Sequence, residues 1–456
     1  MKKNVTPWLW VPTLYFAEGI PYFIVNVVSV TMFKRMGMGN ADLAMYTSLL
    51  YLPWVIKPLW SPLVDVVRTK RWWIVMMQAL MTVCFAAIAL SLPRRTGEPV
   101  GAFAFSLIFF YITAMLSATH DIAADGYYML ALDEHRQSLF VGIRSTFYRI
   151  ASVFGQGVIV VVAGLLENRF GDIPRAWNTT LLASSVLFLV VTVWHQFILP
   201  GEAGPSATGR VARLSTPKKC NFSGAPDTVP QGDASTGIAR PKANAHDFFS
   251  AFATFFRKKG VWVAIVFMLL YRLPEALSVK MLTPFMLDAV GDGGLGLSTA
   301  QSGLVYGTVG VIALTLGGII GGVWSAKVGL RKALWPMALA LALPCSVYLY
   351  MALAQPQNLL AIYFCVALDQ FGYGFGFTAY MLYMMYFSRG EYSTSHYAIC
   401  TAFMALSMMV PGFFAGMLQE ALGYCGFFVL VMVCCLATVA VTAILPSGID
   451  PGYGRK

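Results

Sequence analysis

Ionisable side chains inside long apolar segments are the residues of this sequence whose type and spacing could do chemistry. Asp121 and Asp125 lie four residues apart in one such segment, so both carboxylates are expected on one face of a helix. Two carboxylates that share a low-dielectric site repel each other when both are charged, and one of them can then hold a proton near neutral pH. The pair is therefore a candidate for proton exchange.

Other charges lie at matching depths in neighbouring apolar segments, which suggests partners for them. Glu18 is matched in depth by Lys57, and Asp125 is matched by Arg149. A charge at the centre of a bilayer costs about 2.5–3.5 kcal/mol, so each is expected to face a partner or a cavity. The alternative is that these residues form buried pairs that only fix the packing of helices.

A further pair is predicted from local spacing in the second half of the chain. Arg272 and Glu275 are three residues apart and can pair on one helix. Two other cations have simpler interpretations. Arg144 is interpreted as a residue near the cytoplasmic end of its segment, and Lys280 as a lysine whose amine reaches back to the membrane surface.

Twelve apolar segments must position these charges, and each has the length of a membrane-spanning helix, which is about 20 residues. Six precede a polar stretch at 199–259 and six follow it. The predicted spans are residues 8–33, 42–66, 72–92, 101–131, 138–166, 179–199, 260–288, 298–326, 332–354, 358–388, 393–420 and 424–446.

The composition agrees with this interpretation. The chain is 58% hydrophobic and 12% charged, with a mean hydropathy of +0.67, whereas about 25% of a soluble domain is charged. A soluble globular protein is therefore excluded. We predict an all-α membrane protein with an N-terminal six-helix bundle at 1–199, a linker at 200–259 and a C-terminal six-helix bundle at 260–456.

The net charge of +11 follows the membrane rather than a nucleic-acid site. Lys and Arg are concentrated on the side of the membrane that holds both termini and the linker, so these parts are expected in the cytoplasm. Phenylalanines recur at helical spacing just before Arg257, Lys258 and Lys259. This pattern predicts an amphipathic helix near 246–259 that lies on the cytoplasmic leaflet.

Short sequences recur at corresponding places in the two halves, which predicts a pseudo-two-fold relation between the bundles. Ala163, Gly164 and Glu167 in the fifth span correspond to 415, 416 and 419 in the eleventh. A charged loop follows the second span and another follows the eighth. These loops supply a predicted conformational latch at the inner membrane face, formed by Asp65, Arg68, Arg71, Lys327, Arg331 and Lys332.

Helix-breaking residues point to the region between the bundles. Pro21 and Pro274 occupy corresponding places in the first and seventh spans, and interrupted helices in paired positions mark the binding region of a transporter. Glycines at 372, 374 and 376 follow Asp369 and allow close packing or bending of the tenth span. The sequence holds no recognisable catalytic or metal-binding pattern, so no enzyme activity, cofactor or metal is expected.

Five stretches carry a resemblance to a known family. Residues 57–65 read K-P-L-W-S-P-L-V-D, residues 117–125 read S-A-T-H-D-I-A-A-D, and a Tyr148-Arg149 pair follows. Residues 270–276 read L-Y-R-L-P-E-A, and 392–398 read Y-S-T-S-H-Y-A. These stretches resemble those of AmpG-type muropeptide permeases of the major facilitator superfamily. His120 in place of Gln, and Pro274, depart from the family pattern at positions expected to line the cavity.

The resemblance implies import of an anionic muropeptide, or its amino-sugar core, by proton symport with alternating access across a bacterial inner membrane, as part of peptidoglycan recycling. Acetyl-CoA transporters share parts of the pattern, so acetyl-CoA or another anionic metabolite is the alternative solute. A monomer is expected, with lipid as its surroundings and no nucleic-acid partner. A membrane-bound enzyme or a sensor on the same scaffold is the competing class.

The site residues that follow fall into two groups. Proton coupling is assigned to Asp121, Asp125, Glu18 and Glu275, the last two also pairing with cations when no solute is bound. Solute binding is assigned to Lys57, Arg149, Arg272, Asp369, Tyr148 and Tyr271. The basic residues among them, with Lys280, suit an anionic ligand.

Overall fold

A computed structural model describes residues 6–132, 134–201, 252–390 and 393–445, together with Ile449 and Tyr453. Most of the predicted linker, the start of the predicted amphipathic helix and the side chain of Asp65 lie outside the described residues. Of that amphipathic helix, the structure describes residues 252–259; residues 252–256 are helical and bury Phe255 against Phe387, whereas 257–259 form a turn. The predicted linker boundaries therefore stay a prediction.

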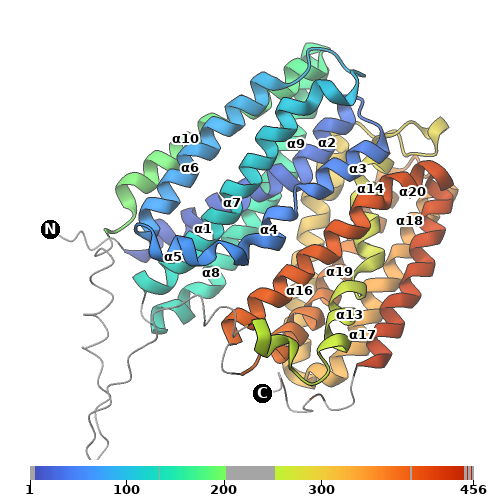
Figure 1. Cartoon of the computed structure of the whole chain (residues 1–456). Helices are drawn as coiled ribbons and strands as arrows, with labels where there is room; N and C mark the ends of the chain where they lie inside the picture. Colours follow the sequence, from blue (N-terminus) through green and yellow to red (C-terminus); the bar gives the residue numbers. More distant parts are fainter. Residues whose placement is uncertain are drawn as a thin grey trace, which may run out of the picture.

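The N-terminal half contains the helices up to residue 198 (Figure 1). They are α1 (Pro7–Phe23), η1 (Ile24–Val28), α2 (Ser29–Arg35), α3 (Asn40–Leu49), α4 (Leu52–Ile56), η2 (Lys57–Leu59), α5 (Ser61–Val66), α6 (Lys70–Ser91), η3 (Val100–Phe103), α7 (Ala104–Ala131), α8 (Glu134–Val153), η4 (Phe154–Ile159), α9 (Val160–Phe170) and α10 (Ile173–Ile198).

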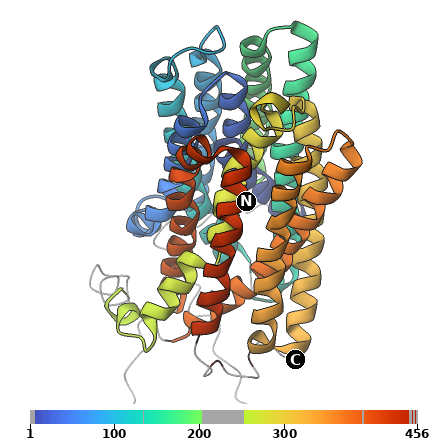
Figure 2. The same cartoon turned by 90° about the vertical axis from the view of Figure 1, so that its right-hand side faces the viewer.

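The C-terminal half begins at residue 261, and its helices run side by side along the length of the molecule (Figure 2). They are α13 (Val261–Leu270), α14 (Leu273–Leu287), η6 (Val290–Asp292), α15 (Thr299–Ser302), η7 (Gly303–Gly310), α16 (Val311–Val328), α17 (Leu330–Ala342), η8 (Leu343–Cys345), α18 (Ser346–Ala354), α19 (Leu359–Phe387) and α20 (Ser393–Ile444).

The predicted twelve-span arrangement is confirmed within the described residues. Ten helices are long and apolar enough to cross a membrane. One of them, α20, bends at Gly423 (φ 66°, ψ 173°) and therefore makes two passes. The remaining pass is the second span, which is broken into α3, α4, η2 and α5 because prolines at 53, 58 and 62 interrupt the helical hydrogen bonds.

Both predicted interruptions of the first and seventh spans are present. Pro21 is followed by the π-helix η1, and Pro274 lies just after the break between α13 and α14. Helix α19 runs unbroken through its three glycines. A methyl group at Gly374 would lie 2.1 Å from the carbonyl oxygen of Leu314, and one at Gly372 would lie 2.2 Å from that of Ala340. The glycines therefore let α19 pack closely between α16 and α17.

Each half has its own hydrophobic interior, and the halves meet through few elements. Among the contacts between halves are those of α2 with α14, α3 with α20, α9 with α15, and η4 with η7. In Figure 1, α2, α3, α14 and α20 come together at the upper right. At the η4–η7 contact main chain meets main chain, because a methyl group at Gly307 would lie 2.0 Å from the carbonyl oxygen of Gln156.

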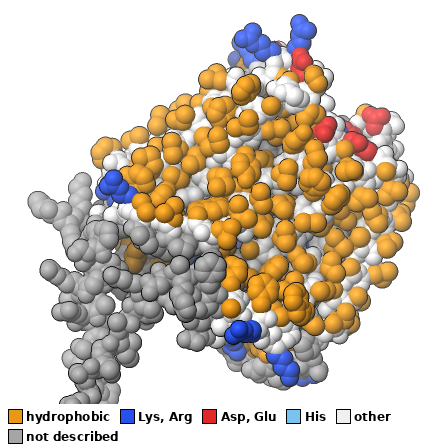
Figure 3. Space-filling model, in the orientation of Figure 1, with side chains coloured by type: hydrophobic (Ala, Val, Ile, Leu, Met, Phe, Trp, Pro, Cys, Tyr) orange, Lys and Arg blue, Asp and Glu red, His pale blue; other side chains and the backbone are white. Residues whose placement is uncertain are grey.

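The outer surface has the character expected of a membrane protein. The face in Figure 3 is covered with hydrophobic side chains, and the charged side chains gather towards the ends of the helices. Large apolar residues such as Leu90, Phe197, Trp262 and Leu360 are each about 70% exposed. Such a belt is stable in lipid and costly in water.

Candidate functional site

The predicted acidic residues of the N-terminal half gather where α1, α4, α7 and α8 meet. Asp125 Oδ1 pairs with Arg144 Nη2 at 2.9 Å and accepts a hydrogen bond from the Tyr15 hydroxyl at 3.2 Å. Asp121 Oδ2 accepts a hydrogen bond from Trp54 Nε1 at 3.0 Å. The Asp125 side chain is 43% exposed. Because a charged pair of that exposure is costly against lipid, we expect the space before it to hold water.

The arginine that pairs with Asp125 differs from the predicted one. Matching depths suggested Arg149, but Arg144 makes the pair and also lies over the Tyr15 ring, 4.5 Å from its centroid. Arg144 is therefore part of the site rather than a residue that only marks the end of its segment. Arg149 extends towards the C-terminal half, where its Nη2 atom lies beside Gly318 of α16. Depth alone identified the correct two helices but not the correct turn of α8.

The predicted Glu18–Lys57 pair is not a direct ion pair, although the two charges lie near enough to interact. No ion pair joins these two residues, both of which lie in the described part of the chain. Glu18 is 8% exposed, and its Oε2 atom is buried without a hydrogen-bond partner. Lys57 begins η2 and is partly buried. Glu18 is thus a buried acid with unused hydrogen-bonding capacity next to the Asp121–Asp125 cluster.

In the C-terminal half, the predicted Arg272–Glu275 pair is present. Arg272 Nη2 lies 3.0 Å from Glu275 Oε2, and Arg272 Nε donates to the same oxygen at 3.1 Å. Arg272 Nη2 also donates to the Tyr373 hydroxyl at 2.7 Å, and the guanidinium lies over the Phe377 ring, 4.8 Å from its centroid. Arg272 is the N-cap residue of α14, so the break before Pro274 is what lets its side chain turn back to Glu275.

Three other residues assigned to solute binding already have partners within their own half. Asp369 accepts hydrogen bonds from the Tyr348 hydroxyl and from Gln370 Nε2. The Tyr271 hydroxyl donates to the carbonyl oxygen of Gly376 at 3.1 Å, and its ring stacks on Tyr380.

Tyr148, the third of these residues, lies against Tyr22 and Phe23 of the N-terminal half. Tyr271 is fully buried, and its part in solute binding stays a prediction.

His120, which departs from the family pattern, points into the N-terminal half. Its Nε2 atom lies 2.9 Å from Gln78 Nε2, and the amide oxygen of Gln78 lies 3.0 Å from His195 Nδ1. His195 Nε2 in turn lies 3.0 Å from the Thr13 hydroxyl. His120 is 1% exposed, so this departure belongs to a buried hydrogen-bond chain and not to the cavity.

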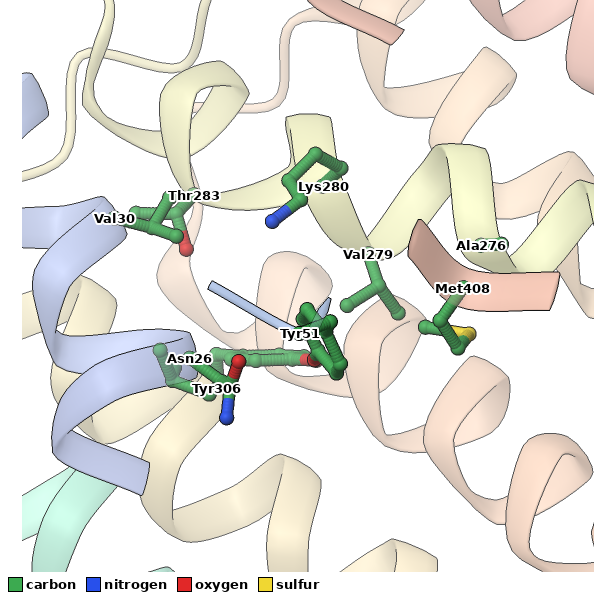
Figure 4. Close-up of a pocket in the computed structure, with 10 residues that line it drawn as sticks. Asn26, Val30, Tyr51, Ala276, Val279, Lys280, Thr283, Tyr306 and Met408 are labelled. Atoms are coloured by element: carbon green, nitrogen blue, oxygen red, sulfur yellow. The ribbon is translucent and has the colours of Figure 1, made fainter. Parts of the chain in front are cut away.

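A small pocket, with a cavity volume of about 30 Å³, lies between the halves (Figure 4). It is lined by Asn26, Val27, Val30 and Tyr51 from the N-terminal half and by Ala276, Val279, Lys280, Thr283, Tyr306 and Met408 from the C-terminal half. Lys280 does not extend to the membrane surface. It is 6% exposed, donates to the Thr47 hydroxyl at 3.1 Å, and in Figure 4 its amine points into the space above Tyr51.

The halves are held together at one end by a cluster that we name the polar junction: Lys34, Asn40, Asp288, Gln419 and Tyr424. Lys34 Nζ pairs with Asp288 at 2.5 Å and donates to Asn40 Oδ1 at 2.7 Å. Asn40 Nδ2 donates to Gln419 Oε1 at 2.7 Å, and the Tyr424 hydroxyl donates to Asp288. The junction connects α2 and α3 with α14 and α20.

Glu167 makes an equivalent link between the halves where α9 contacts α15. It accepts from Trp177 Nε1 at 2.8 Å and from the Thr299 hydroxyl at 2.6 Å, and it pairs with Arg35 at 2.9 Å. Sequence reasoning missed these residues as a functional group. The signal was available, because Glu167 and Gln419 occupy equivalent positions of the internal repeat.

The predicted latch residues lie apart from the polar junction. Arg68 lies over the Trp72 ring, and Arg71 Nη2 donates to the carbonyl oxygen of Gln196, so both contacts are within the N-terminal half. Lys327 lies in the last turn of α16, and Arg331 and Lys332 lie in the first turn of α17. The latch stays a prediction.

Comparison with known proteins identifies the family. Residues 13–410 match the model of the Major Facilitator Superfamily. The chain is 23% identical to the anhydromuropeptide permease of Escherichia coli K12 over 91% of this chain and 74% of that protein. It is 22% identical to the transporter named AmpG 4 of Rickettsia conorii over 96% of each chain.

Solved structures agree with the fold. A bacterial homologue of the human lysosomal transporter Spinster, in an inward-facing and unoccupied conformation, matches with a TM-score of 0.67 and 13% identity over 96% of this chain and 94% of that one. A D-xylose–proton symporter matches with a TM-score of 0.66 and 11% identity over 98% of each chain. With two related helix bundles, a charged site between them and relatives of this kind, the chain belongs to the major facilitator superfamily and is a multi-pass membrane transporter.

Proposed function

We propose that this transporter imports an anionic amino-sugar solute of the anhydro-muropeptide kind, together with protons, across the inner membrane of a bacterium. The name of the Escherichia coli relative, anhydromuropeptide permease, supports the solute class. The distribution of Lys and Arg supports cytoplasmic termini, which would put the polar junction on the periplasmic side. The two halves would move around the site between them, so that the site opens to one side of the membrane at a time.

The observation that carries the proposal is that some cations at the site pair with a carboxylate of the protein and others do not. Arg149, Lys280 and Lys57 form no ion pair among the described residues, although Asp121 and Glu18 lie near Lys57, whereas Arg144 and Arg272 each pair with a carboxylate. Buried or half-buried cations without partners are costly unless an anion reaches them. A solute with several carboxylates would supply that charge, with Arg149 and Lys57 as its first contacts.

Proton coupling is assigned to the acidic cluster. Glu18 is a buried carboxylate that forms no ion pair, and it lies beside Asp121 and Asp125. Asp125 is water-accessible and holds Arg144 only while it is charged. Protonation of Asp125 would release Arg144 towards the solute, so that proton and anion enter the site together. Glu275 would play the corresponding part for Arg272.

Alternating access requires the polar junction to open. In the described arrangement Lys34, Asn40 and Glu167 bind the opposite half, so a solute cannot pass between α2 and α14 or between α9 and α15. The acidic cluster at the other end of the site stays in contact with water. This arrangement corresponds to a state open towards the cytoplasm.

The test is uptake of a radiolabelled anhydro-muropeptide by proteoliposomes that contain the full-length protein, with and without an inward proton gradient. We expect gradient-driven accumulation that is lost in Asp125→Asn, because the neutral amide neither takes up a proton nor pairs with Arg144. Asp172→Asn is the matched control, since Asp172 caps α10 at the far end of the N-terminal half.

Three results would contradict the proposal. Accumulation without a proton gradient would show that protons do not drive transport. Unchanged uptake by Asp125→Asn would remove the acidic cluster from coupling. Uptake of acetyl-CoA and not of the muropeptide would show that the proposed solute is wrong, while the proposed transport mechanism would still hold.

A further inference from the structure

The pocket between the halves contains a cation without an ion pair and an acceptor without a hydrogen-bond partner among the described residues. Lys280 carries three N–H donors, and its one hydrogen bond to a described residue goes to the Thr47 hydroxyl. Thr47 in turn donates to the carbonyl oxygen of Leu43, so it serves Lys280 as an acceptor only. The Tyr51 ring lies 5.4 Å from the Lys280 amine and adds a cation–π contact. None of these groups neutralises the charge.

Asn26 supplies the acceptor on the opposite wall. Its side chain is 4% exposed, its amide nitrogen donates to the carbonyl oxygen of Tyr22, and its Oδ1 atom is buried without a hydrogen-bond partner. In Figure 4, Asn26 and Lys280 lie on opposite sides of the pocket, with Tyr51 and Tyr306 between them. A ligand that fits this pocket carries a negative charge for Lys280 and an N–H or O–H donor for Asn26.

The position of the pocket relates it to both the site and the polar junction. On α14, Lys280 lies five residues after Glu275 and eight residues before Asp288, which is about 7.5 Å and about 12 Å along the helix axis. The pocket therefore lies between the Arg272–Glu275 pair and the polar junction. A solute that spans the site would end in it.

We propose that this pocket binds a carboxylate of the transported solute on Lys280, while Asn26 Oδ1 accepts a hydrogen bond from the amide N–H next to that carboxylate. The terminal residue of a peptide has this pair of groups, and so does the peptide part of a muropeptide. This inference rests on the proposed function and deepens it. It makes Lys280 the residue that selects solutes with a free peptide carboxylate and Asn26 the residue that orients it.

The test measures binding of two radiolabelled compounds to the full-length protein in nanodiscs: an anhydro-muropeptide, and the same compound with its terminal carboxylate converted to a carboxamide. We expect the wild type to prefer the acid by about tenfold or more, the usual effect of a charge-assisted hydrogen bond. Lys280→Met should reduce that ratio to near one, and Lys280→Arg should retain it. Asn26→Leu should weaken both compounds alike, because both carry the N–H.

Lys57→Met is the control, because it removes another unpaired cation of the site. It should weaken both compounds and keep the acid-to-amide ratio. Thermal unfolding without ligand checks the fold: Lys280→Met should be no less stable than the wild type, since it removes a buried unpaired charge and keeps the length of the side chain.

Several results overturn the inference. They are a wild type that binds acid and amide equally, a preference that survives in Lys280→Met, and a loss of stability in Lys280→Met that accounts for its weaker binding. If coenzyme A competes with the muropeptide, and this competition is lost in Lys280→Met, then Lys280 binds a phosphate and not a peptide carboxylate. Failure of the proposed function has a different signature, which is a wild type that binds neither muropeptide compound.

Discussion

Gly416 offers the sharpest test of how the two halves separate. A methyl group at this position would lie 1.9 Å from the carbonyl oxygen of Asn40, where ordinary contact begins at 3.4 Å. Gly416→Ala therefore requires α3 and α20 to move apart by about 1.5 Å. Overpacking of this kind costs about 1–3 kcal/mol, which corresponds to a roughly 5- to 150-fold shift in an equilibrium. We expect the variant to favour the state in which the polar junction is open.

Spin labels on Arg95→Cys and Gln357→Cys would report this change, because the two exposed sites lie in different halves at the end that holds the polar junction. Pulsed electron paramagnetic resonance on the protein without its native cysteines should give a longer distance for Gly416→Ala. Gly322→Ala is the matched control, since its methyl group would meet nothing within 4 Å. The reasoning is refuted if folded Gly416→Ala keeps the wild-type distances, or if Gly322→Ala changes them equally.

Three further predictions concern individual contacts. Lys34→Asp should weaken the polar junction and lower uptake, and the double variant Lys34→Asp/Asp288→Lys should restore part of it; no recovery in an uptake assay would argue against a direct pair. Glu275→Gln should lower the unfolding midpoint sharply, because an unpaired buried Arg272 costs about 3–5 kcal/mol, whereas a stability equal to the wild type would mean that water reaches the guanidinium. His120→Gln should leave solute preference unchanged in a competition assay, because this side chain lies in a hydrogen-bond chain away from the cavity; an altered preference would contradict that placement.

The sequence was sufficient to predict the fold because lipid imposes strong rules on a chain. Every span must be apolar and long enough to cross the bilayer, so even the second span, which prolines break into short pieces, was recognisable by its length. The paired interruptions at Pro21 and Pro274 were likewise visible as residue types.

The pairing of charges was predictable only where it is local. Arg272 and Glu275 lie on adjacent turns, so helical spacing was enough. Asp125 pairs with Arg144 rather than Arg149 because the rotation of α8 about its axis, and not its depth, decides which arginine faces α7. Rotation depends on contacts such as that of Gly19 with Ala151, which no spacing rule predicts.

The polar junction was missed, and Lys280 was left with two interpretations, for a related reason. Lys34 lies in the last turn of α2 and Asp288 caps the end of α14, so both look like ordinary solvated helix ends, and only the meeting of the two halves covers most of each side chain. Lys280 has an apolar stem that could have reached the membrane surface, but Gly412 brings α20 against that stem and holds the amine inside.

The contact of η4 with η7, where glycine main chains of the two halves touch, has a mechanical consequence. Because main chain lies against main chain at this contact, few large side chains oppose rotation, so one half can tilt on the other about this point. Tilting that widens the passage on one side of such a fulcrum narrows it on the other. A bulky residue at Gly157 or Gly307 should therefore slow both halves of the transport cycle together, whereas damage to the polar junction should affect one of them.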